Sequence, residues 1–211
     1  MTRQTLSQDV YQKIKHEIVT SKLLPGTPLL EKEISELLDV SRTPVREALH
    51  VLEVEGLVEF EARKGARVAQ LSRQDLQDAY EARSWVEPNI VEKVARLADS
   101  ELVSKLEEAI NKMPVEPTSH EQASLAFTAD LEFHRLIIEA GGNRLVCDLV
   151  ENARAITRRA AYFVPPGRYY EAREEHKSIL KAIIDGDPSQ ARELMKLHIE
   201  ASAKRMFVFY R

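Results

Sequence analysis

Three histidines and one aspartate are spaced so that all four would face the interior of a helical bundle. Asp130 and His134 are four residues apart, on the apolar face of one predicted helix. His176 and His198 each stand in the centre of an apolar stripe in two further predicted helices. Buried polar groups need partners, and one cation would satisfy all four side chains at once. The pattern therefore predicts a metal centre inside the bundle.

This interpretation competes with an ordinary core role for each histidine. An inward histidine is more often a packed residue with its own hydrogen-bond partner, and an aspartate four residues before a histidine is weak evidence alone. Four such residues are harder to satisfy independently. Three imidazoles and one carboxylate suit Zn, Ni, Fe or Mn, with metal availability deciding among them. A metalloenzyme is a second hypothesis, because an open coordination position could be catalytic. No paired nucleophile and base is evident, so we do not expect an enzyme.

A second constellation lies in the stretch SRTPVREAL, at residues 41–49. Pro44 fits the first turn of a helix, because the first four N–H groups of a helix have no acceptor within it. Arg42, Arg46 and His50 follow at intervals of four and share one helical face. Arginines at the exposed start of a recognition helix bind guanine edges in the major groove. The stretch therefore predicts a DNA-reading helix.

The neighbouring elements predict how this helix is positioned. Apolar spacing indicates a helix at about 6–21, a loop at 23–30 and a short helix around Ile34, and Gly56 ends the third helix. The hydroxyls of Ser41 and Thr43 could cap the third helix or bind phosphate. A hairpin then follows, in which Val58 and Phe60 pair with Ala66 and Val68, with Lys64 and Gly65 near its tip. This order predicts a winged helix-turn-helix.

From Ser72 onward the pattern changes to long helical periods. Glycine and proline residues separate the periods and set their ends. Six helices and no strand are expected, at about 74–97, 100–113, 120–140, 143–163, 169–185 and 188–209. The predicted fold is mainly α, with a winged helix-turn-helix domain at 1–70 and an all-helical bundle at 71–211.

Two polar residues interrupt apolar rows of this bundle. Arg83 lies in a row of the first helix, and Asn152 lies in a row with Leu145 and Leu149, so both are expected to face inward. An inward arginine must be paired. Its partner is either Glu87, one turn away, or the carboxylate of a ligand, and both alternatives stay open at this point.

Composition excludes several classes of protein. Hydrophobic residues make up 44% of the chain, which argues against disorder. Cys147 is the only cysteine, so a reducing compartment is expected. No apolar run approaches the roughly 20 residues of a membrane span, so we expect a cytoplasmic protein without a membrane partner. Residues 1–70 hold 10 Lys and Arg against 11 Asp and Glu, a net charge of −1. DNA binding would therefore need a clustered basic face.

The run LLPGTPLLEKEISELLDVSRTPVREALHVLEVEGLVEFEARKGARV resembles the DNA-binding domain of GntR-family bacterial transcription regulators. The rest, with YEARSWVEP, DLEFH, EEH, IDGDPSQAR and MKLH, resembles the FCD effector domain of the FadR-like branch, in its shorter six-helix VanR-type form. The resemblance implies a ligand-responsive regulator that acts as a repressor. It would bind a palindromic operator as a homodimer, with half-sites about one helical turn apart. An architectural DNA binder whose helical domain only dimerises remains an alternative.

The resemblance also implies roles for individual residues. The DNA contacts expected from it are Lys32, Arg42, Thr43, Arg46 and Gly65, and the positions of Ser41, His50 and Lys64 on the same helix and hairpin add these three residues. The lysine at position 32 replaces the arginine more usual there, and so keeps the charge but loses the bidentate fork. The expected ligands of a divalent metal are Asp130, His134, His176 and His198. A small organic-acid effector would have its carboxylate on Arg83, with Tyr80 and Asn152 lining the pocket.

Overall fold

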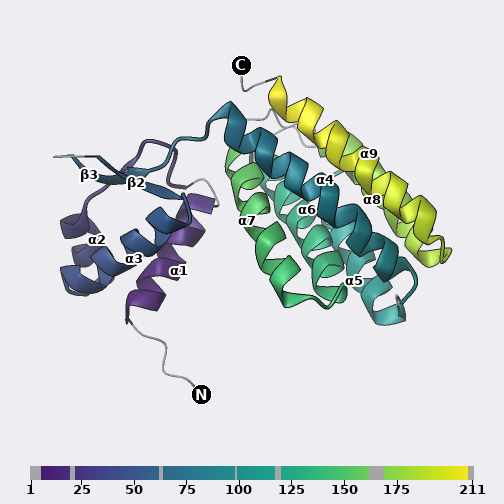
Figure 1. Cartoon of the computed structure of the whole chain (residues 1–211), viewed down its shortest axis with the longest axis horizontal. Helices are drawn as coiled ribbons and strands as arrows, with labels where there is room; N and C mark the ends of the chain where they lie inside the picture. Colours follow the sequence, from purple (N-terminus) through teal and green to yellow (C-terminus); the bar gives the residue numbers. More distant parts are fainter. Residues whose placement is uncertain are drawn as a thin grey trace. The chain divides into compact units, whose positions relative to one another are not determined.

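The chain folds into two compact units, Met1–Ser72 and Arg73–Arg211. In the described part of the chain they contain nine helices and one small sheet (Figure 1), which confirms the mainly α fold. The structure is a computed structural model, and it describes residues 6–19, 22–61, 64–97, 99–116, 120–161 and 169–208.

The N-terminal unit is built on three helices and a small antiparallel sheet. The helices are α1 (Leu6–Val19), α2 (Glu31–Leu38) and α3 (Arg42–Val54). Helix α3 buries Val45, Ala48, Leu49 and Leu52, and it packs against α1, which contributes Ile14 and Ile18 to the same core. The opposite, polar face of α3 is therefore left exposed, while its apolar face anchors the helix to the core.

The start of α3 agrees with the local signals in its sequence. Ser41 takes an extended N-cap conformation, although its side chain makes no capping hydrogen bond, and the helix begins at Arg42 with Pro44 in its first turn. The turn before it is tight because Asp39 adopts a left-handed conformation with φ 53°. Gly56, with φ 69°, lets the chain leave the helix after its C-cap.

The sheet contains one strand more than the sequence predicts. The expected pairs Val58–Val68 and Phe60–Ala66 join β2 (Val58–Glu61) to β3 (Gly65–Val68), which confirms the hairpin. In addition, β1 (Pro28–Leu29) pairs with β3, so the strand order is β1-β3-β2. The expectation of a loop throughout 23–30 was wrong for these two residues. An edge strand tolerates proline, because only one of its sides needs hydrogen bonds.

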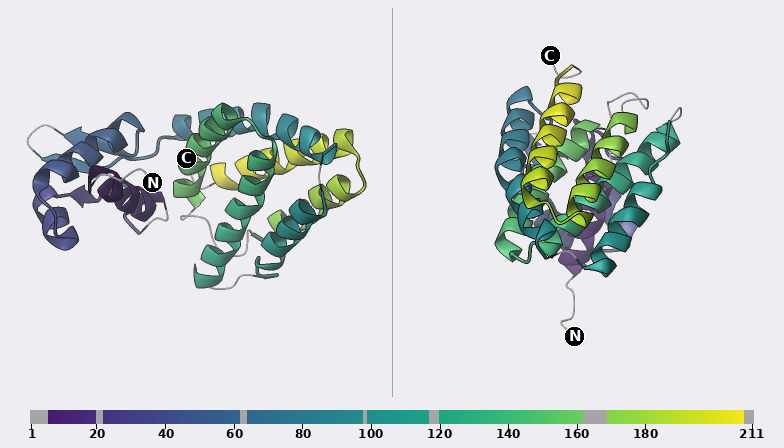
Figure 2. Two further views of the ribbon diagram at one scale, coloured as in Figure 1. Left: turned by 90° about the horizontal axis from the view of Figure 1, so that it is seen from below. Right: turned by 90° about the vertical axis from the view of Figure 1, so that its right-hand side faces the viewer.

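The second unit is a bundle of the six predicted helices (Figure 2). They are α4 (Arg73–Ala95), α5 (Ser100–Asn111), α6 (His120–Ala140), α7 (Arg144–Ala161), α8 (Tyr169–Ile184) and α9 (Pro188–Phe207). Helix α4 packs along α9 and also contacts α6, α7 and α8, so it borders most of the bundle interior. Asp187 caps α9 through its side chain, and Pro188 takes the first helical position, as predicted. None of the described helices is long and apolar enough to cross a membrane.

Candidate metal centre and DNA-contacting surface

The four predicted metal ligands meet in the interior of the bundle. Asp130 and His134 come from α6, His176 from α8 and His198 from α9. One donor atom of each lies within 4.8 Å of the others, and all three imidazoles are buried. The four residues are far apart in the sequence, but each lies on the apolar face of its helix. When these faces pack together in the core, the four side chains meet.

Two carboxylates orient the imidazoles from behind. His134 Nδ1 lies 2.6 Å from Glu87 Oε2, and His198 Nδ1 lies 2.6 Å from Glu175 Oε2. Burial by itself would raise the pKa of Glu87, but the neighbouring Arg83 and His134 hold that pKa well below its ordinary value. Each ionised carboxylate needs an N–H donor, so we place the imidazole proton on Nδ1. The Nε2 lone pairs then face the centre of the cluster.

His134 and His176 are neutral in this environment. Burial, assisted by the charge of Arg154, lowers the pKa of His134 to about 4. Burial and the two neighbouring imidazoles hold the pKa of His176 well below its ordinary value. His134 Nε2 lies 3.0 Å from His198 Nε2, and His176 Nε2 lies 3.3 Å from both. With the protons of His134 and His198 on Nδ1, their two Nε2 atoms face each other as acceptors, which either a cation or an N–H of His176 Nε2 would satisfy. His176 Nδ1 has no hydrogen-bond partner among the described residues.

The donor set also fits a divalent metal in size. Zinc binds nitrogen at about 2.1 Å, so neighbouring ligand nitrogens are expected to lie roughly 3.0–3.4 Å apart. The observed nitrogen separations of 3.0 and 3.3 Å agree with this spacing, and Asp130 Oδ1 lies 3.4 Å from His176 Nε2. Carboxylates behind two of the rings are the usual second shell of metal-bound histidines. A bound cation would supply positive charge and open coordination positions for an oxygen ligand.

Arg83 is buried and already has a protein partner. Its Nε donates to Glu87 Oε1 at 2.6 Å, and its Nη1 reaches Thr157 Oγ1 at 3.4 Å. The intrahelical partner considered from the sequence is therefore present. Tyr80, one turn earlier, is also buried, and its hydroxyl lies 3.2 Å from Ser202 Oγ.

The expected inward position of Asn152 is wrong. Its side chain is exposed, as are its row neighbours Leu145 and Leu149, which are 75% and 66% exposed. Helix α7 instead buries the row that contains Val150, Ala153, Arg154 and Thr157. The more apolar row of α7 faces outward, so hydrophobicity alone pointed to the wrong face.

Arg154 is the residue that sequence reasoning missed on this buried row. It is 2% exposed, and its Nη1 and Nη2 lie 3.7 Å from Glu87 Oε2 and Asp130 Oδ2 respectively. Within the described residues, neither Nε nor Nη1 has a hydrogen-bond partner. The available signal was a basic residue in a row of α7 that also holds Val150, Ala153 and Thr157.

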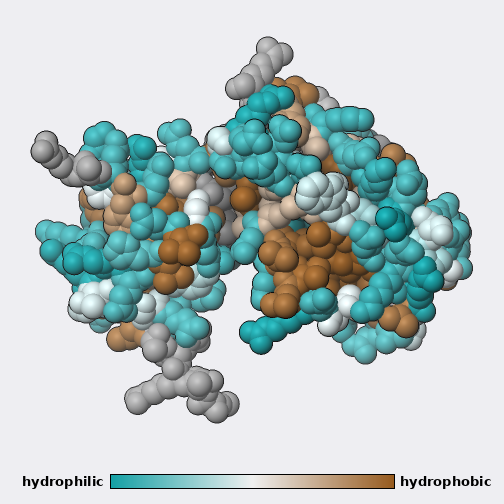
Figure 3. All heavy atoms as spheres, viewed as in Figure 1, coloured by the Kyte–Doolittle hydropathy of each residue, from teal (hydrophilic) through white to brown (hydrophobic). Residues whose placement is uncertain are grey.

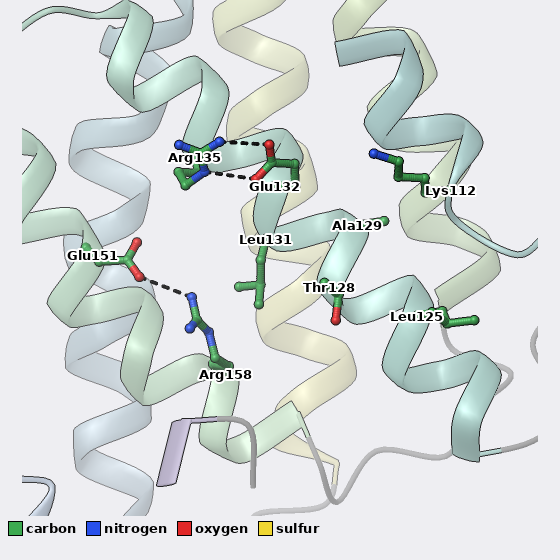
Figure 4. Close-up of a pocket in the computed structure, with 9 residues that line it drawn as sticks. All are labelled: Lys112, Leu125, Thr128, Ala129, Leu131, Glu132, Arg135, Glu151 and Arg158. Atoms are coloured by element: carbon green, nitrogen blue, oxygen red, sulfur yellow. Dashed lines mark hydrogen bonds and ion pairs between the residues drawn. The ribbon is translucent and has the colours of Figure 1, made fainter. Parts of the chain in front are cut away.

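A separate pocket of about 550 Å³ lies among α5, α6 and α7 (Figure 4). Arg158 extends along α7 toward Glu151, at 3.1 Å, and Arg135 on α6 pairs with Glu132. Tyr80, Arg83 and Asn152 are not among its lining residues. Because none of these three residues borders it, and its two arginines already pair with glutamates, this pocket does not correspond to the predicted effector site.

All eight residues predicted to contact DNA are exposed on the N-terminal unit. Two contacts join the elements that carry them. Arg46 binds Glu31 with Nε and Nη2, at 2.8 and 2.7 Å, which ties α3 to the start of α2. His50 stacks on Phe60 with ring centroids 4.7 Å apart, which ties α3 to the sheet. The N-terminus of α2, the polar face of α3 and strand β2 therefore form one continuous surface.

Arg46 and Lys64, two basic residues of this surface, are held by exposed ion pairs. Besides Arg46 with Glu31, Lys64 pairs with Glu61 at 3.0 Å. The hydrogen bond from Arg46 lowers the pKa of Glu31, so the carboxylate stays ionised and restrains the guanidinium. Exposed pairs are worth only about 0–1 kcal/mol each, so phosphates or base edges could replace the carboxylates at small cost.

Comparisons with known proteins agree with both units. Residues 6–68 match the bacterial regulatory proteins of the gntR family, and residues 78–201 match the FCD domain. The HTH-type transcriptional repressor RspR of Escherichia coli K12 is 27% identical over 202 residues, which cover 93% of this chain and 87% of RspR.

Two solved structures share the fold. McbR/YncC of E. coli superposes with a TM-score of 0.85 at 19% identity, over 98% of this chain and 99% of the other. The Zn²⁺-bound FCD domain of TM0439 superposes with a TM-score of 0.53 at 23% identity, over 67% of this chain and 99% of the other.

Proposed function

This chain belongs to the GntR family of bacterial transcription regulators and carries an FCD domain, and from this premise we propose that it is a ligand-responsive repressor. The GntR family consists of DNA-binding regulators and not of enzymes. In the proposed mechanism, a homodimer binds a palindromic operator. A small carboxylic acid then enters the metal centre of the helical unit and changes the affinity for the operator.

The donor cluster of Asp130, His134, His176 and His198 is the observation that carries this proposal. Its four donor atoms, all within 4.8 Å of one another, are placed to hold a cation, and a cation in turn favours a carboxylate ligand. The TM0439 FCD domain was solved with Zn²⁺, which supports the same role for this cluster. The metal would be Zn, Ni, Fe or Mn. The acid can act as an effector only if it binds two arrangements of the protein with different affinity.

Helix α3 would read the operator from the major groove. We propose that Arg42 and Arg46 contact base edges, with Ser41 and Thr43 near the phosphates and Lys64 and Gly65 at the wing tip. Lys32 and His50 would contribute from the ends of the same exposed surface. Because the domain has no net positive charge, specificity would depend on these oriented groups more than on general attraction to DNA.

The proposed dimer would use the apolar face of α7 and the adjacent part of α4. Leu145 and Leu149 are exposed on α7, and Trp85 is 66% exposed on α4, which packs along α7. Figure 3 shows an apolar patch in this region of the helical unit. Patches of this kind on a folded unit commonly mark an interface, and a two-fold dimer would match a palindromic site.

Native mass spectrometry of the full chain, purified without chelators, tests the centre and the assembly together. We expect a dimer with one metal ion per chain, and loss of the metal in the His176→Ala variant. Leu149→Glu should shift the mass to the monomer, whereas Leu197→Glu, which changes an exposed leucine of α9, should leave the dimer intact. A metal-free wild-type protein that also fails to bind added Zn²⁺ or Ni²⁺ would rule out the centre.

Selection of duplexes from a random DNA pool tests the operator. We expect the enriched sequences to show dyad symmetry with half-sites about one helical turn apart. Arg46→Ala should reduce the difference between the specific and the non-specific free energies of DNA binding by about 1–3 kcal/mol, which lowers the ratio of the two affinities. Arg46→Lys keeps the charge but should not restore that ratio. An unchanged ratio would exclude base reading by Arg46.

A further inference from the structure

Arg154 is a fully buried cation that the protein itself leaves incompletely bonded. It is 2% exposed, and its two neighbouring carboxylates stand at 3.7 Å, beyond normal hydrogen-bond distance. Nε and Nη1 are without a hydrogen-bond partner among the described residues. A guanidinium cannot relieve this by losing its proton, because its pKa stays too high for that in proteins. Buried charges of this kind are normally paired, so the missing partner calls for an explanation.

The carboxylates near Arg154 are already engaged. Glu87 accepts from Arg83 and from His134, each at 2.6 Å. Asp130 belongs to the donor cluster and would be committed to the metal. The next carboxylate along α7, Glu151, pairs with Arg158 at 3.1 Å. With the metal in place, Arg154 would therefore lack an anion of its own.

The formal charges of the centre point the same way. The arginines Arg83 and Arg154 balance the carboxylates Glu87 and Asp130, and an imidazole that binds a metal is neutral. Glu175 and Arg205 form a further pair behind His198, at 2.7 Å, and also cancel. A divalent metal consequently leaves a charge of +2 in a water-poor interior. Such an excess is costly unless anions neutralise it.

We propose that Arg154 is the anion anchor of the metal centre and that the natural ligand is a small dicarboxylate. One carboxylate would take the bidentate fork of Arg154 beside Asp130, and the two negative charges together would balance the loaded centre. This inference rests on the proposed function and makes it more specific. It assigns the anion to Arg154 on α7 and leaves Arg83 on α4 as the partner of Glu87.

Titrations of the Zn²⁺-loaded full chain by calorimetry, with malonate as dianion and acetate as monoanion at equal ionic strength, test this assignment. Wild-type protein should bind malonate at least tenfold more tightly than acetate. Arg154→Gln should weaken malonate binding about 10- to 100-fold, the range for a hydrogen bond to a charged group. Arg154→Lys should be intermediate, because it keeps the charge but loses the fork. Arg144→Gln, at an exposed arginine of the same helix, is the matched control and should change nothing.

Metal affinity gives a readout that a purely structural arginine would not produce. Arg154 repels a cation in the cluster, so Arg154→Gln should bind Co²⁺ severalfold more tightly while it binds malonate more weakly. The absorption of bound Co²⁺ measures the first effect and calorimetry the second. If Arg154→Gln fails to fold, the malonate titration of Arg154→Lys replaces it. A loss of malonate affinity in that variant supports the inference, and an unchanged affinity overturns it.

The outcomes separate this inference from the function on which it rests. A wild-type chain that binds no metal overturns both. A wild-type chain that binds metal and malonate, with equal malonate affinity in Arg154→Gln, overturns only the role of Arg154. Parallel losses of metal and malonate in that variant would mean that Arg154 supports the fold, and would overturn the inference as well. Equal affinity for acetate and malonate would overturn the preference for a dianion.

Discussion

Replacing Glu87 with glutamine should expose how strongly the bundle depends on one buried carboxylate. Glu87 is 1% exposed and accepts from Arg83 Nε and His134 Nδ1, each at 2.6 Å, with Arg154 Nη1 3.7 Å away. The glutamine amide keeps the shape but removes the charge. Arg83 and Arg154 then remain buried with only the partly exposed Asp130 as a counter-ion.

The magnitude follows from the cost of leaving a buried charge without its partner. Removing one member of a buried ion pair costs about 3–5 kcal/mol, against a total stability of roughly 5–15 kcal/mol for a domain. With a urea dependence of about 2 kcal/mol per molar, the midpoint for unfolding of the metal-free helical unit should fall by about 2 M. Affinity for the metal should also drop about 10- to 100-fold, because His134 loses the carboxylate behind its ring.

Urea unfolding followed by far-UV circular dichroism measures the stability, and fluorescence of Trp85 assigns the transition to the helical unit, since it is the chain's only tryptophan. Glu175→Gln is the control, because Glu175 also supports a histidine but is 27% exposed and lies beside the partly exposed Arg205. It should lower metal affinity with a smaller loss of stability. If Glu87→Gln and Glu175→Gln lose the same stability, or the loss at Glu87 is below about 1 kcal/mol, the reasoning about the buried network is refuted.

Three further predictions concern pH, packing and the metal. His134 has a pKa of about 4 in the folded chain against 6.5 when unfolded, so only the unfolded chain gains this proton between those values. Metal-free protein should therefore lose up to about 3 kcal/mol of stability as the pH falls from 6.5 to 4, and His134→Gln should flatten the pH dependence of the urea midpoint. Gly141→Ala would place a Cβ 2.7 Å from Ile90 Cγ2, so thermal unfolding should show a loss of about 1–3 kcal/mol, whereas an unchanged melting temperature would show that α4 yields freely. Chelation of the bound metal should lower the melting temperature of the wild type but not of His176→Ala, and equal shifts would place the metal elsewhere.

The start and end of α3 could be read from the sequence because they depend on local backbone chemistry. Pro44 suits an unpaired first turn, and Gly56 suits a left-handed exit, whatever the rest of the chain does. The apolar stripes of α6, α8 and α9 likewise placed His134 and its partners inside, since a side chain must follow the face of its own helix. The spacing of apolar residues in each helix was therefore enough to predict that the donor side chains face the interior of the bundle.

The partners of the buried charges were decided only by the tertiary structure. Periodicity suggested Arg83 with Glu87 as one option, but not that Glu87 also supports His134 on another helix. It also assigned Asn152 to the interior, because α7 has two apolar rows and the more hydrophobic one faces outward. Which row is buried depends on the surfaces of the neighbouring helices, so it cannot be predicted from the sequence of α7 alone. For this reason Arg154, the buried cation beside the predicted metal ligands, could be identified only from the packing of the six helices.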